Sequence, residues 1–536
     1  MTCQVMLIGL DGATFSVLDP LMQDGIMPFL HSFIASGVRA DLRSVIPALT
    51  PPAWTSLVTS RSPGNHGVFD FFCKESPDSH HIRLTTSRDV HAETIWSIAN
   101  RHGLRANVLN FPLMFPPPQI DGYVVPGWMP WKQLRLGCSP AHLFDRLKGL
   151  PGFNARELAM DTNLEAKAIE GCQPDEYKEW IELHIAREQQ WLRVLKMLMH
   201  EEPCALTAVL FDGVDRIQHL CWRFVDPVYA GEVRTRWEQE VRARCLEYFS
   251  QLDDVLAECV RLAGPEATVV MASDHGFGPQ RRTFFVNAWL AQHGYLKWAN
   301  DREQHGHNAE GLGVGQIARH AYLLDWEHTR AYAPMPSSNG IHIVRATKDH
   351  PNGVPEAQYE SFRDRLIGEL RSLLAPDSGE PVVSQIWKRE DVFSGPYMTL
   401  APDLTLELQD GGLVSILASE TPVSPRPQPS GTHRPEGIFI AGGPRIRQGV
   451  QLSALSILDV APLLLYSLAV PIPTDLEGRA PTAALAPAAL QARPIDTAPA
   501  LAITSIEPSQ PQTDVALDAE SEAILMQQLR ALGYAE

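Results

Sequence analysis

Val269-Val-Met-Ala-Ser-Asp274-His275-Gly is a short apolar run that ends in a carboxylate and an imidazole. The same pattern occurs near the start of the chain, at Leu7-Ile-Gly-Leu-Asp11-Gly. A third apolar run, Leu206–Phe211, is soon followed by Asp215-Arg-Ile-Gln-His219. Apolar runs of this length, bounded by polar residues, are typical of strands buried in a parallel sheet. These stretches therefore predict a sheet whose strands end in side chains able to bind metals.

Strand-like and helix-like segments alternate over residues 1–280. We predict strands at Val5–Leu10, Ala106–Asn110, Leu206–Phe211 and Thr268–Ala272, and helices at Met27–Ser36, Thr94–His102 and Gln239–Leu262. This alternation indicates an α/β fold, with a mostly parallel sheet flanked by helices on both faces. In such sheets ligands bind beyond the carboxyl ends of the strands. Asp11, Asp215, Asp274 and His275 all lie just after predicted strands.

The alternation stops after residue 285. Residues 286–399 are predicted to form a cap inserted into a catalytic core made of residues 1–285 and 400–480, with one cap helix at Gln358–Leu374. The core is expected to resume at Asp403-Leu-Thr-Leu-Glu-Leu.

The C-terminal region has a different composition. Residues 481–518 are rich in Ala and Pro and lack periodic apolar positions, which predicts a flexible linker. Residues 519–536 are predicted to form an amphipathic C-terminal helix.

The composition excludes some classes of protein. The chain has 536 residues, of which 44% are hydrophobic and 20% are charged, as in ordinary globular proteins. Its 45 Lys and Arg against 63 Asp and Glu give a net charge of −18, which argues against a nucleic-acid surface. An anionic substrate is still compatible with this charge, because bound divalent cations dominate their local field.

The first residues give no sign of export. The segment from Met1 to Leu10 lacks a basic start and a small-residue cleavage site, so it is interpreted as the first core strand and not as a signal peptide. The chain contains no apolar run of about 18 residues, which predicts no membrane span. The eight cysteines show no CxxC spacing and are expected to be reduced. A cytoplasmic location is expected, and the oligomeric state is open.

Thr50 is the candidate nucleophile. It precedes Pro51-Pro52-Ala53, a pattern that predicts a helix N-cap followed by proline in the first turn. A hydroxyl at this place lies at the positive end of the helix dipole, which suits both a nucleophile and a phosphoryl oxygen. The alternative is a plain helix cap, and the candidate metal ligands elsewhere in the chain favour the nucleophile.

Asp215 and His219 are four residues apart, so on a helix both would face one metal. The alternative is an ordinary hydrogen-bonded surface pair, and Asp212 competes for the role of ligand. Asp274 and His275 are adjacent, and both could reach a common ion from the end of a strand or form a solvated turn.

Two more candidates are weaker by themselves. Asp11 could bind a metal or cap the following helix. His433, in Ser430-Gly-Thr-His433-Arg-Pro, is a single histidine in a polar segment.

The whole set comprises three carboxylates, three imidazoles and one hydroxyl, enough for two divalent metals around a nucleophile. Aspartate and histidine without cysteine favour Zn²⁺, with Mn²⁺ as the alternative, over Mg²⁺. Two-metal sites neutralise charge during in-line displacement at phosphorus. Attack by Thr50 would give a phospho- or nucleotidyl-threonine that water then hydrolyses. The substrate would be a small phosphorylated molecule.

Several motifs together resemble the alkaline phosphatase superfamily, and within it the type I phosphodiesterase/nucleotide pyrophosphatase branch, including its bacterial predicted phosphohydrolases and phosphomutases. The resemblance spans roughly residues 4–480. It rests on Thr50-Pro-Pro-Ala-Trp-Thr, Pro63-Gly-Asn-His-Gly-Val, Asp215-Arg-Ile-Gln-His, Ser273-Asp-His-Gly-Phe-Gly-Pro and Gly431-Thr-His-Arg-Pro-Glu-Gly.

The resemblance implies an alkaline-phosphatase-like core and a role for each candidate residue. One metal would be held by Asp215, His219 and His433. The other would be held by Asp11, Thr50, Asp274 and His275, with Thr50 as the nucleophile.

One departure from the family pattern concerns the substrate. Nucleotide pyrophosphatases resembling this chain carry an asparagine after the nucleophile, and none closely follows Thr50. Nucleotide specificity is therefore open. A phosphomonoesterase or phosphomutase remains an alternative, as does a scaffold that binds metal without catalysis. His66 either orients its loop or acts directly, and Asn339 and His342 either face the substrate or lie on the surface.

Overall fold

The computed structural model describes residues 2–74, 79, 82–158, 172–299, 323–335, 337–348 and 350–500. These residues form a nine-stranded sheet of order β16-β2-β15-β8-β1-β7-β5-β6, with β17 also paired to β2. Its strands are β1 Val5–Leu10, β2 Val38–Arg43, β5 Ala106–Leu109, β6 Gly122–Val125, β7 Leu206–Phe211, β8 Thr268–Ala272, β15 Glu436–Gly442, β16 Val450–Gln451 and β17 Leu455–Ser456. The five strands from β8 to β6 are parallel, and β15 is antiparallel to both neighbours. The predicted α/β fold with a mostly parallel sheet is confirmed.

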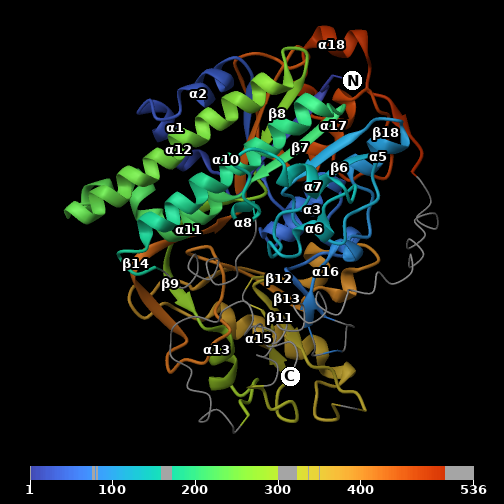
Figure 1. The fold of residues 1–536 in the computed structure, drawn as a ribbon. Coiled ribbons are helices and arrows are strands. Elements are labelled where there is room, and N and C mark those ends of the chain that lie inside the picture. Colours follow the sequence, from blue (N-terminus) through green and yellow to red (C-terminus); the bar gives the residue numbers. More distant parts are fainter. Residues whose placement is uncertain are drawn as a thin grey trace.

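Helices cover both faces of this sheet (Figure 1). The main ones are α1 Phe15–Gln23, α2 Pro28–Ala35, α3 Thr50–Thr59, α5 Ile95–Arg101, α10 Tyr177–Glu201, α11 Gly213–Val225, α12 Arg236–Ala263 and α17 Val460–Ser467. The side chains of β1 alternate between two apolar cores, as expected from the period of a strand. Ile8 and Leu10 belong to the core that contains α10 and α12, whereas Val5 and Leu7 belong to the core that contains α3, α5 and α17.

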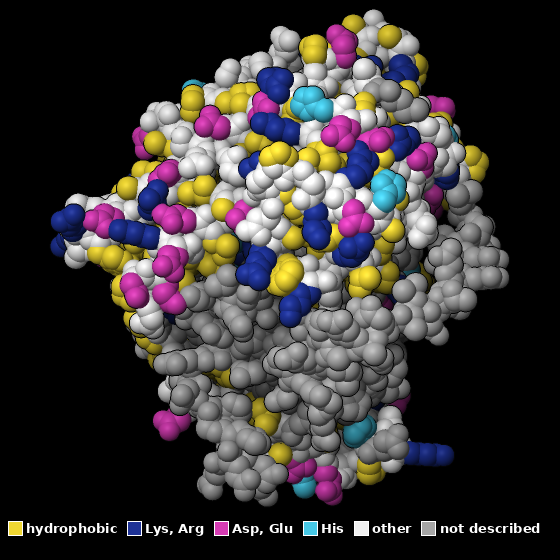
Figure 2. Space-filling model, viewed as in Figure 1, with side chains coloured by type: hydrophobic (Ala, Val, Ile, Leu, Met, Phe, Trp, Pro, Cys, Tyr) yellow, Lys and Arg dark blue, Asp and Glu magenta, His cyan; other side chains and the backbone are white. Residues whose placement is uncertain are grey.

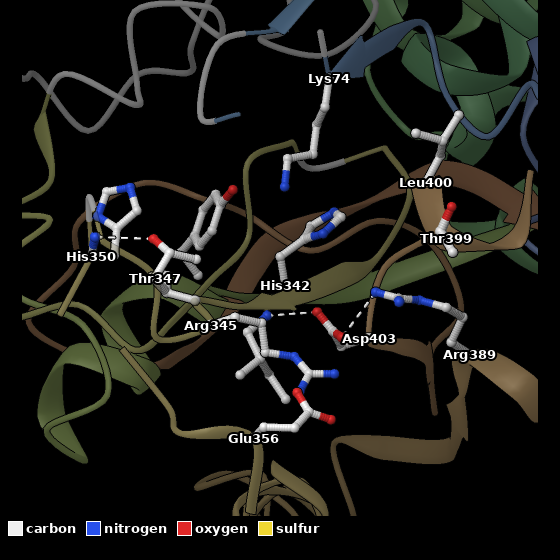
Figure 3. A pocket seen from close by; sticks show the side chains of 13 residues that line it. Lys74, His342, Arg345, Thr347, His350, Glu356, Arg389, Thr399, Leu400 and Asp403 are labelled. Atoms are coloured by element: carbon white, nitrogen blue, oxygen red, sulfur yellow. Dashed lines mark hydrogen bonds and ion pairs between the residues drawn. The ribbon is translucent and has the colours of Figure 1, made fainter. Parts of the chain in front are cut away.

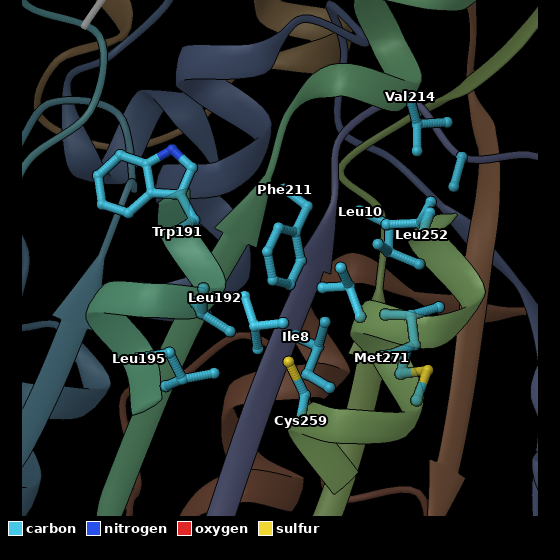
Figure 4. Close-up of a cluster of buried hydrophobic side chains, with 14 of the residues drawn as sticks. Ile8, Leu10, Trp191, Leu192, Leu195, Phe211, Val214, Leu252, Cys259 and Met271 are labelled. Carbon is cyan, nitrogen blue, oxygen red and sulfur yellow. The ribbon is translucent and has the colours of Figure 1, made fainter. Parts of the chain in front are cut away.

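The first of these cores shows why the central strands contain no charged residue. Figure 4 shows Ile8 and Leu10 near Phe211 and Met271 of the neighbouring strands, with side chains of α10 and α12 around them. Every residue of β1, β7 and β8 is buried. With both faces covered, a charged side chain at any position of these strands would lose its contact with water. Charged side chains therefore first appear beyond the ends of the strands, and the polar residues within them are the threonines Thr207 and Thr268.

A second sheet lies below the first in Figure 1, in the order β10-β11-β13-β12. Its strands are β10 Ala331–Tyr332, β11 Gly340–Ile343, β12 Val383–Lys388 and β13 Leu404–Leu408, and α13 Val286–Gln292 and α15 Tyr359–Arg371 belong to the same region. The strand that was expected to resume the core at Asp403 is thus part of the smaller sheet. Leu404, Leu406 and Leu408 pack in its apolar core, and the chain re-enters the large sheet only at β15. The boundary of the cap stays a prediction.

A long antiparallel ribbon joins the two regions. It consists of β9 Gly276–Phe284 and β14 Val423–Arg434, and it pairs His433 with Phe277. Because β9 begins directly after His275, this register returns the chain to the end of β8. The ribbon therefore explains how His433 reaches the residues that follow the parallel strands.

Residues 481–500 differ from the expected flexible linker. They contain a helix, α18 Pro487–Ala492, and a short strand, β19 Thr497–Ala498, which pairs with β18 Ile472–Pro473. Leu485 is buried against the core that contains α17, so apolar contacts order this stretch in spite of its composition. The rest of the predicted linker, residues 501–518, and the predicted C-terminal helix, residues 519–536, lie outside the described residues.

The face shown in Figure 2 carries basic and acidic side chains interspersed. On α12, Arg236 pairs with Glu240. None of the described helices combines the length and apolarity needed to span a bilayer. All eight cysteines are free thiols, as predicted.

Candidate metal centre and nucleophile

The structure brings all seven predicted site residues together at the carboxyl edge of the parallel strands. Asp11 follows β1, and Asp274 and His275 follow β8. Asp215 and His219 lie on α11, the helix that follows β7, while His433 comes from the end of β14 and Thr50 from α3. Six of the seven are buried, and His219 is partly buried.

Asp11, Asp274 and His275 form one group whose ligand atoms lie within 4.8 Å of one another. His275 Nε2 lies 3.3 Å from Asp274 Oδ2 and 3.6 Å from Asp11 Oδ1. Thr50 Oγ1 lies 3.4 Å from the same nitrogen. These three residues and Thr50 are the four that the resemblance implies as ligands of one metal.

Asp215, His219 and His433 form the second group. His433 Nε2 lies 3.3 Å from Asp215 Oδ1, and His219 Nε2 lies 3.4 Å from it. The spacing of four residues on α11 therefore places Asp215 and His219 on one face, as expected. His275 connects the two groups, since its ring stacks on that of His433 with centroids 3.7 Å apart, and Asp215, His275 and His433 also bring ligand atoms within 4.8 Å.

The orientation of the three imidazoles is compatible with metal binding. In His219, His275 and His433, Nδ1 lies 3.1 Å from a backbone carbonyl oxygen, so Nδ1 carries the hydrogen. In a neutral ring Nε2 then offers a lone pair. The Nε2 atoms of His219 and His433 face each other at 3.1 Å. Two lone pairs at this distance repel each other unless a cation or a proton lies between them, and a carbonyl on the other nitrogen is the usual arrangement of a metal-bound histidine.

The carboxylates show the same need for a cation. Asp11 Oδ1, Asp215 Oδ1 and Asp274 Oδ2 are buried, and within the described ranges none of these oxygens has a hydrogen-bond partner. Burial, together with the charge of Asp274, raises the pKa of Asp11 well above its usual range. Burial also raises the pKa of Asp274, and it lowers the pKa of both His275 and His433. Two divalent cations would fit these residues, since buried carboxylates and neutral imidazoles are both ligands for them.

Thr50 occupies a slightly different place in its helix from the one expected. It is the first helical residue of α3, and Leu49 is the N-cap. Pro51 and Pro52 have no N–H, and the N–H of Ala53 donates to Leu49 O at 2.9 Å. The helix start therefore offers fewer free N–H groups than expected. Binding of an anion beside Thr50 would depend more on cations held by the candidate metal ligands.

A model of the family described as type I phosphodiesterase / nucleotide pyrophosphatase matches residues 5–436. The chain belongs to this family. The chain is therefore an enzyme of the phosphodiesterase/nucleotide pyrophosphatase type. A comparison with curated proteins found no match.

Two solved structures are similar in fold to this member of the type I phosphodiesterase / nucleotide pyrophosphatase family. An inactive form of murine ectonucleotide pyrophosphatase / phosphodiesterase 5 in complex with AMP has 14% identity and a TM-score of 0.49, over 87% of this chain and 95% of that chain. Phosphonoacetate hydrolase from Sinorhizobium meliloti 1021 in complex with phosphonoformate has 16% identity and a TM-score of 0.49, with the same coverage of both chains.

Two residues that support the site were not found from the sequence. Trp54 Nε1 donates to Asp11 Oδ2 at 3.2 Å, and Gln218 Nε2 donates to the carbonyl of Gly12 at 2.8 Å. Trp54 comes four residues after Thr50, so helical periodicity would have placed it on the same face.

Gly12 has φ +65°, and a Cβ there would lie 2.8 Å from the ring of Phe277, so both its backbone angle and its packing require glycine.

The weaker candidates have other contacts. His66 Nδ1 accepts from the N–H of Val68, and its Nε2 lies 2.9 Å from Ser56 Oγ, so His66 orients its loop. Asp212 lies 3.7 Å from Arg187 and is in neither metal-ligand group.

Asn339 and His342 are not surface residues, because both are buried. The amide of Asn339 is used by Gly412 and Val414, which leaves His342 as the one of the two that lines a pocket.

Glu188 gives a testable pH effect near the start of α11. It accepts hydrogen bonds of 2.9 Å from the N–H of Gly213 and from the hydroxyl of Tyr248, and burial raises its pKa from 4.5 to about 8. The folded chain therefore holds the carboxyl proton of Glu188 more tightly than the unfolded chain does. The contribution of Glu188 to stability is complete below pH 4.5 and is lost as the pH rises to about 8, with a slope of up to about 1.4 kcal/mol per pH unit.

We expect Glu188→Gln to remove this part of the pH dependence of the free energy of unfolding, because the amide oxygen still accepts both bonds but does not ionise. Urea unfolding between pH 5 and pH 8 measures it. Glu179→Gln, at an exposed position of α10, is the control and should follow the wild type. Parallel curves for Glu188→Gln and the wild type would show that Glu188 does not titrate in this range.

Proposed function

We propose that this chain is a metal-dependent phosphohydrolase that cleaves phosphodiester or pyrophosphate bonds, with Thr50 as the nucleophile. The observation that supports this best is the facing pair of Nε2 atoms in His219 and His433, 3.1 Å apart, next to three carboxylate oxygens that accept no hydrogen bond from the described residues. A buried cluster of this kind is costly without cations and suits two of them.

The proposed ligand sets follow the two groups of side chains. Asp215, His219 and His433 would hold one ion, and Asp11, Thr50, Asp274 and His275 would hold the other. Bound divalent cations would lower the pKa of the threonine hydroxyl and neutralise the charge of the phosphoryl oxygens. Because the donors are carboxylates and imidazoles and include no thiolate, we propose Zn²⁺, with Mn²⁺ as the alternative.

The side chains themselves would perform a two-step displacement. Thr50 Oγ1 forms a bond to phosphorus while the bond from phosphorus to the leaving oxygen breaks, and the hydroxyl proton is finally carried by the leaving group. Water would then cleave the bond between phosphorus and Thr50 Oγ1 in the phospho- or nucleotidyl-threonine, which releases the product and restores the hydroxyl. Trp54 holds one oxygen of Asp11, and the backbone carbonyls at Ala48, Gly276 and Gly431 hold the imidazoles, so the centre is ordered before substrate arrives.

The choice of substrate gives a direct test of this function. The Zn²⁺-loaded chain is expected to hydrolyse bis-p-nitrophenyl phosphate with a higher kcat/KM than p-nitrophenyl phosphate. Release of p-nitrophenolate, followed by absorbance for both substrates and with Mn²⁺ as the second metal, measures the ratio. A preference for the monoester would favour a phosphatase or phosphomutase. Metal-loaded protein without activity on either substrate would contradict the proposal and favour the scaffold.

A further inference from the structure

The pocket beside the smaller sheet that His342 lines has a volume of about 330 Å³, but both of its arginines are already paired. Arg389 pairs with Asp403, as Figure 3 shows, and Arg345 pairs with Glu356. The charges of this pocket therefore give no argument for an anionic ligand. A basic side chain with a clearer relation to the proposed reaction lies beside the candidate metal ligands.

This side chain, Arg216, lies at the border of the candidate metal centre. It directly follows Asp215 on α11, and its Nη1 lies 3.4 Å from Asp215 Oδ2. The other oxygen of Asp215 lies 3.4 Å from His219 Nε2 and 3.3 Å from His433 Nε2. One carboxylate therefore separates the guanidinium from the two imidazoles. The Arg216 side chain is 12% exposed, so a ligand can reach it from solvent.

Trp128 holds the Arg216 side chain in place. The guanidinium carbon lies 4.6 Å from the centre of the Trp128 ring, which is within the range of a cation–π contact. The ring of Phe71 packs against Trp128, with centroids 6.0 Å apart. Trp128 lies in the loop after β6 and Arg216 in the helix after β7, so the carboxyl edge of the parallel strands brings the two together.

The loops after β5 and β6 have an unusual backbone. Asn110, Leu113 and Trp128 have φ angles of +64°, +55° and +58°, a region that residues other than glycine rarely adopt. Conformations of this kind are held by the surrounding structure and are concentrated at ligand sites. The indole N–H of Trp128 is also buried and, within the described ranges, donates no hydrogen bond. An oxygen of a bound ligand would satisfy this donor.

The balance of charges indicates the kind of ligand. On the α10 side of the centre, Arg187 lies 3.7 Å from Asp212, so these two charges offset each other. While Thr50 is a neutral hydroxyl, the two proposed divalent cations, the three carboxylates of the centre and Arg216 leave two positive charges in excess. A phosphodiester carries one negative charge, whereas a pyrophosphate esterified on each phosphorus carries two. The pyrophosphate therefore matches the charge of the centre better.

We propose that Arg216, held by Trp128, binds a second phosphate of the substrate next to the phosphoryl group that Thr50 attacks, and so gives preference to pyrophosphate bonds. This inference rests on the proposed function. A guanidinium can donate two parallel hydrogen bonds to a phosphate, which suits arginine to this role. The contact with Asp215 does not prevent it, because 3.4 Å is long for a hydrogen bond and a cation bound by Asp215 would share the charge of the carboxylate.

Isothermal titration of the Zn²⁺-loaded Thr50→Ala chain tests this role, since this variant should bind ligands without cleaving them. The probes are dimethyl phosphate and symmetric dimethyl pyrophosphate, which differ by one phosphate. We expect the pyrophosphate to bind at least about tenfold more tightly. The further change Arg216→Met should remove this difference, because it removes the charge-assisted hydrogen bonds to the second phosphate.

Two other quantities separate this role from a purely structural one. In the Arg216→Met background the affinity for dimethyl phosphate should change by less than about threefold, and the zinc content should not change, since none of the proposed metal ligands is altered. An arginine needed only for the structure of the centre would lower the zinc content and the affinity for both probes together.

Arg156→Met is the matched control, because Arg156 is exposed and stacks on the neighbouring Trp131, with its guanidinium carbon 4.9 Å from the ring centre. It should keep the preference for the pyrophosphate. Trp128→Phe keeps an aromatic face but lacks the indole N–H, so it should lose part of the preference. Circular dichroism shows whether each variant is folded, and Trp128→Phe carries the test if Arg216→Met is not.

The outcomes distinguish this inference from the proposed function. Equal binding of the two probes before Arg216 is changed, a preference that survives Arg216→Met, or loss of zinc in that variant would overturn the role of Arg216. Hydrolysis of bis-p-nitrophenyl phosphate by the wild type would still support the function in each of these cases. A wild type that binds zinc but is inert on this diester would contradict the function, and the inference would fall with it.

Discussion

Replacing Thr50 with alanine is expected to reduce kcat for bis-p-nitrophenyl phosphate by at least about 10³-fold. The hydroxyl lies 3.4 Å from His275 Nε2, at the centre of the candidate site, and its loss removes the atom that attacks phosphorus. The metal content is expected to stay at two ions per chain, because six other ligands remain. Steady-state kinetics and metal analysis of the same preparation measure both quantities.

The matched control for this variant is Thr59→Ala. Thr59 is buried in the same helix, but its hydroxyl donates to the carbonyl of Thr55 at 2.6 Å and lies nine residues along the helix from Thr50. It should retain nearly full activity. A Thr50→Ala variant that loses less than about tenfold in kcat would show that another group, such as a water molecule, attacks phosphorus. Acid-quenched wild type should in addition carry a p-nitrophenyl phosphoryl group on Thr50, detectable by mass spectrometry.

The sequence predicts those parts of the site that local structure determines. β1, β7 and β8 begin and end at the residues predicted, because a fully apolar run flanked by polar residues has few other ways to be buried. Asp11 and Asp274 follow such runs, and parallel strands place their carboxyl ends at one edge. Asp215 and His219 needed only a helix start to share a face.

His433 shows where local reasoning ends. Its own segment is a polar stretch that makes it only a weak candidate, and its assignment to one metal with Asp215 and His219 came from the resemblance to a family. The structure brings it to His275 through the pairing of β14 with β9, a contact between segments far apart in the chain. The pairing of two strands depends on the side chains of both strands and on the elements that pack over them. A single stretch of sequence does not contain this information.

The dependence of strand pairing on distant segments also explains why the observed sheet at the cap differs from the predicted one. The stretch Leu404–Leu408 has the pattern of a buried strand, and that much was predicted, but its partners are β11 and β12 of the smaller sheet. The contact of Arg216 with Trp128 could not be found from the sequence either, since the two residues come from separate segments. Substrate preference is expected to depend on such non-local contacts, whereas the chemistry depends on the strand ends.

The second large effect is expected for His433→Ala. This variant should bind one metal ion per chain where the wild type binds two, because the remaining ligands of that group, Asp215 and His219, leave the site short of one imidazole. Loss of one cation removes several kcal/mol of charge stabilisation, so kcat/KM should fall by at least about 10²-fold. Inductively coupled plasma mass spectrometry after gel filtration gives the metal content, and diester hydrolysis gives the activity.

A second histidine variant shows whether the effect comes from loss of a metal ligand or from loss of any imidazole. His328 pairs with Asp325 at 2.9 Å, and 61% of its side chain is exposed, so His328→Ala should keep two ions and full activity. Zn²⁺ should also raise the thermal unfolding midpoint of the wild type more than that of His433→Ala, since a ligand stabilises the folded state in proportion to its binding. Two ions retained in His433→Ala would contradict the proposed ligand set. His433 would then not be a required ligand, and the second ion would be held by other side chains, with Asp215 and His219 as the remaining members of that group.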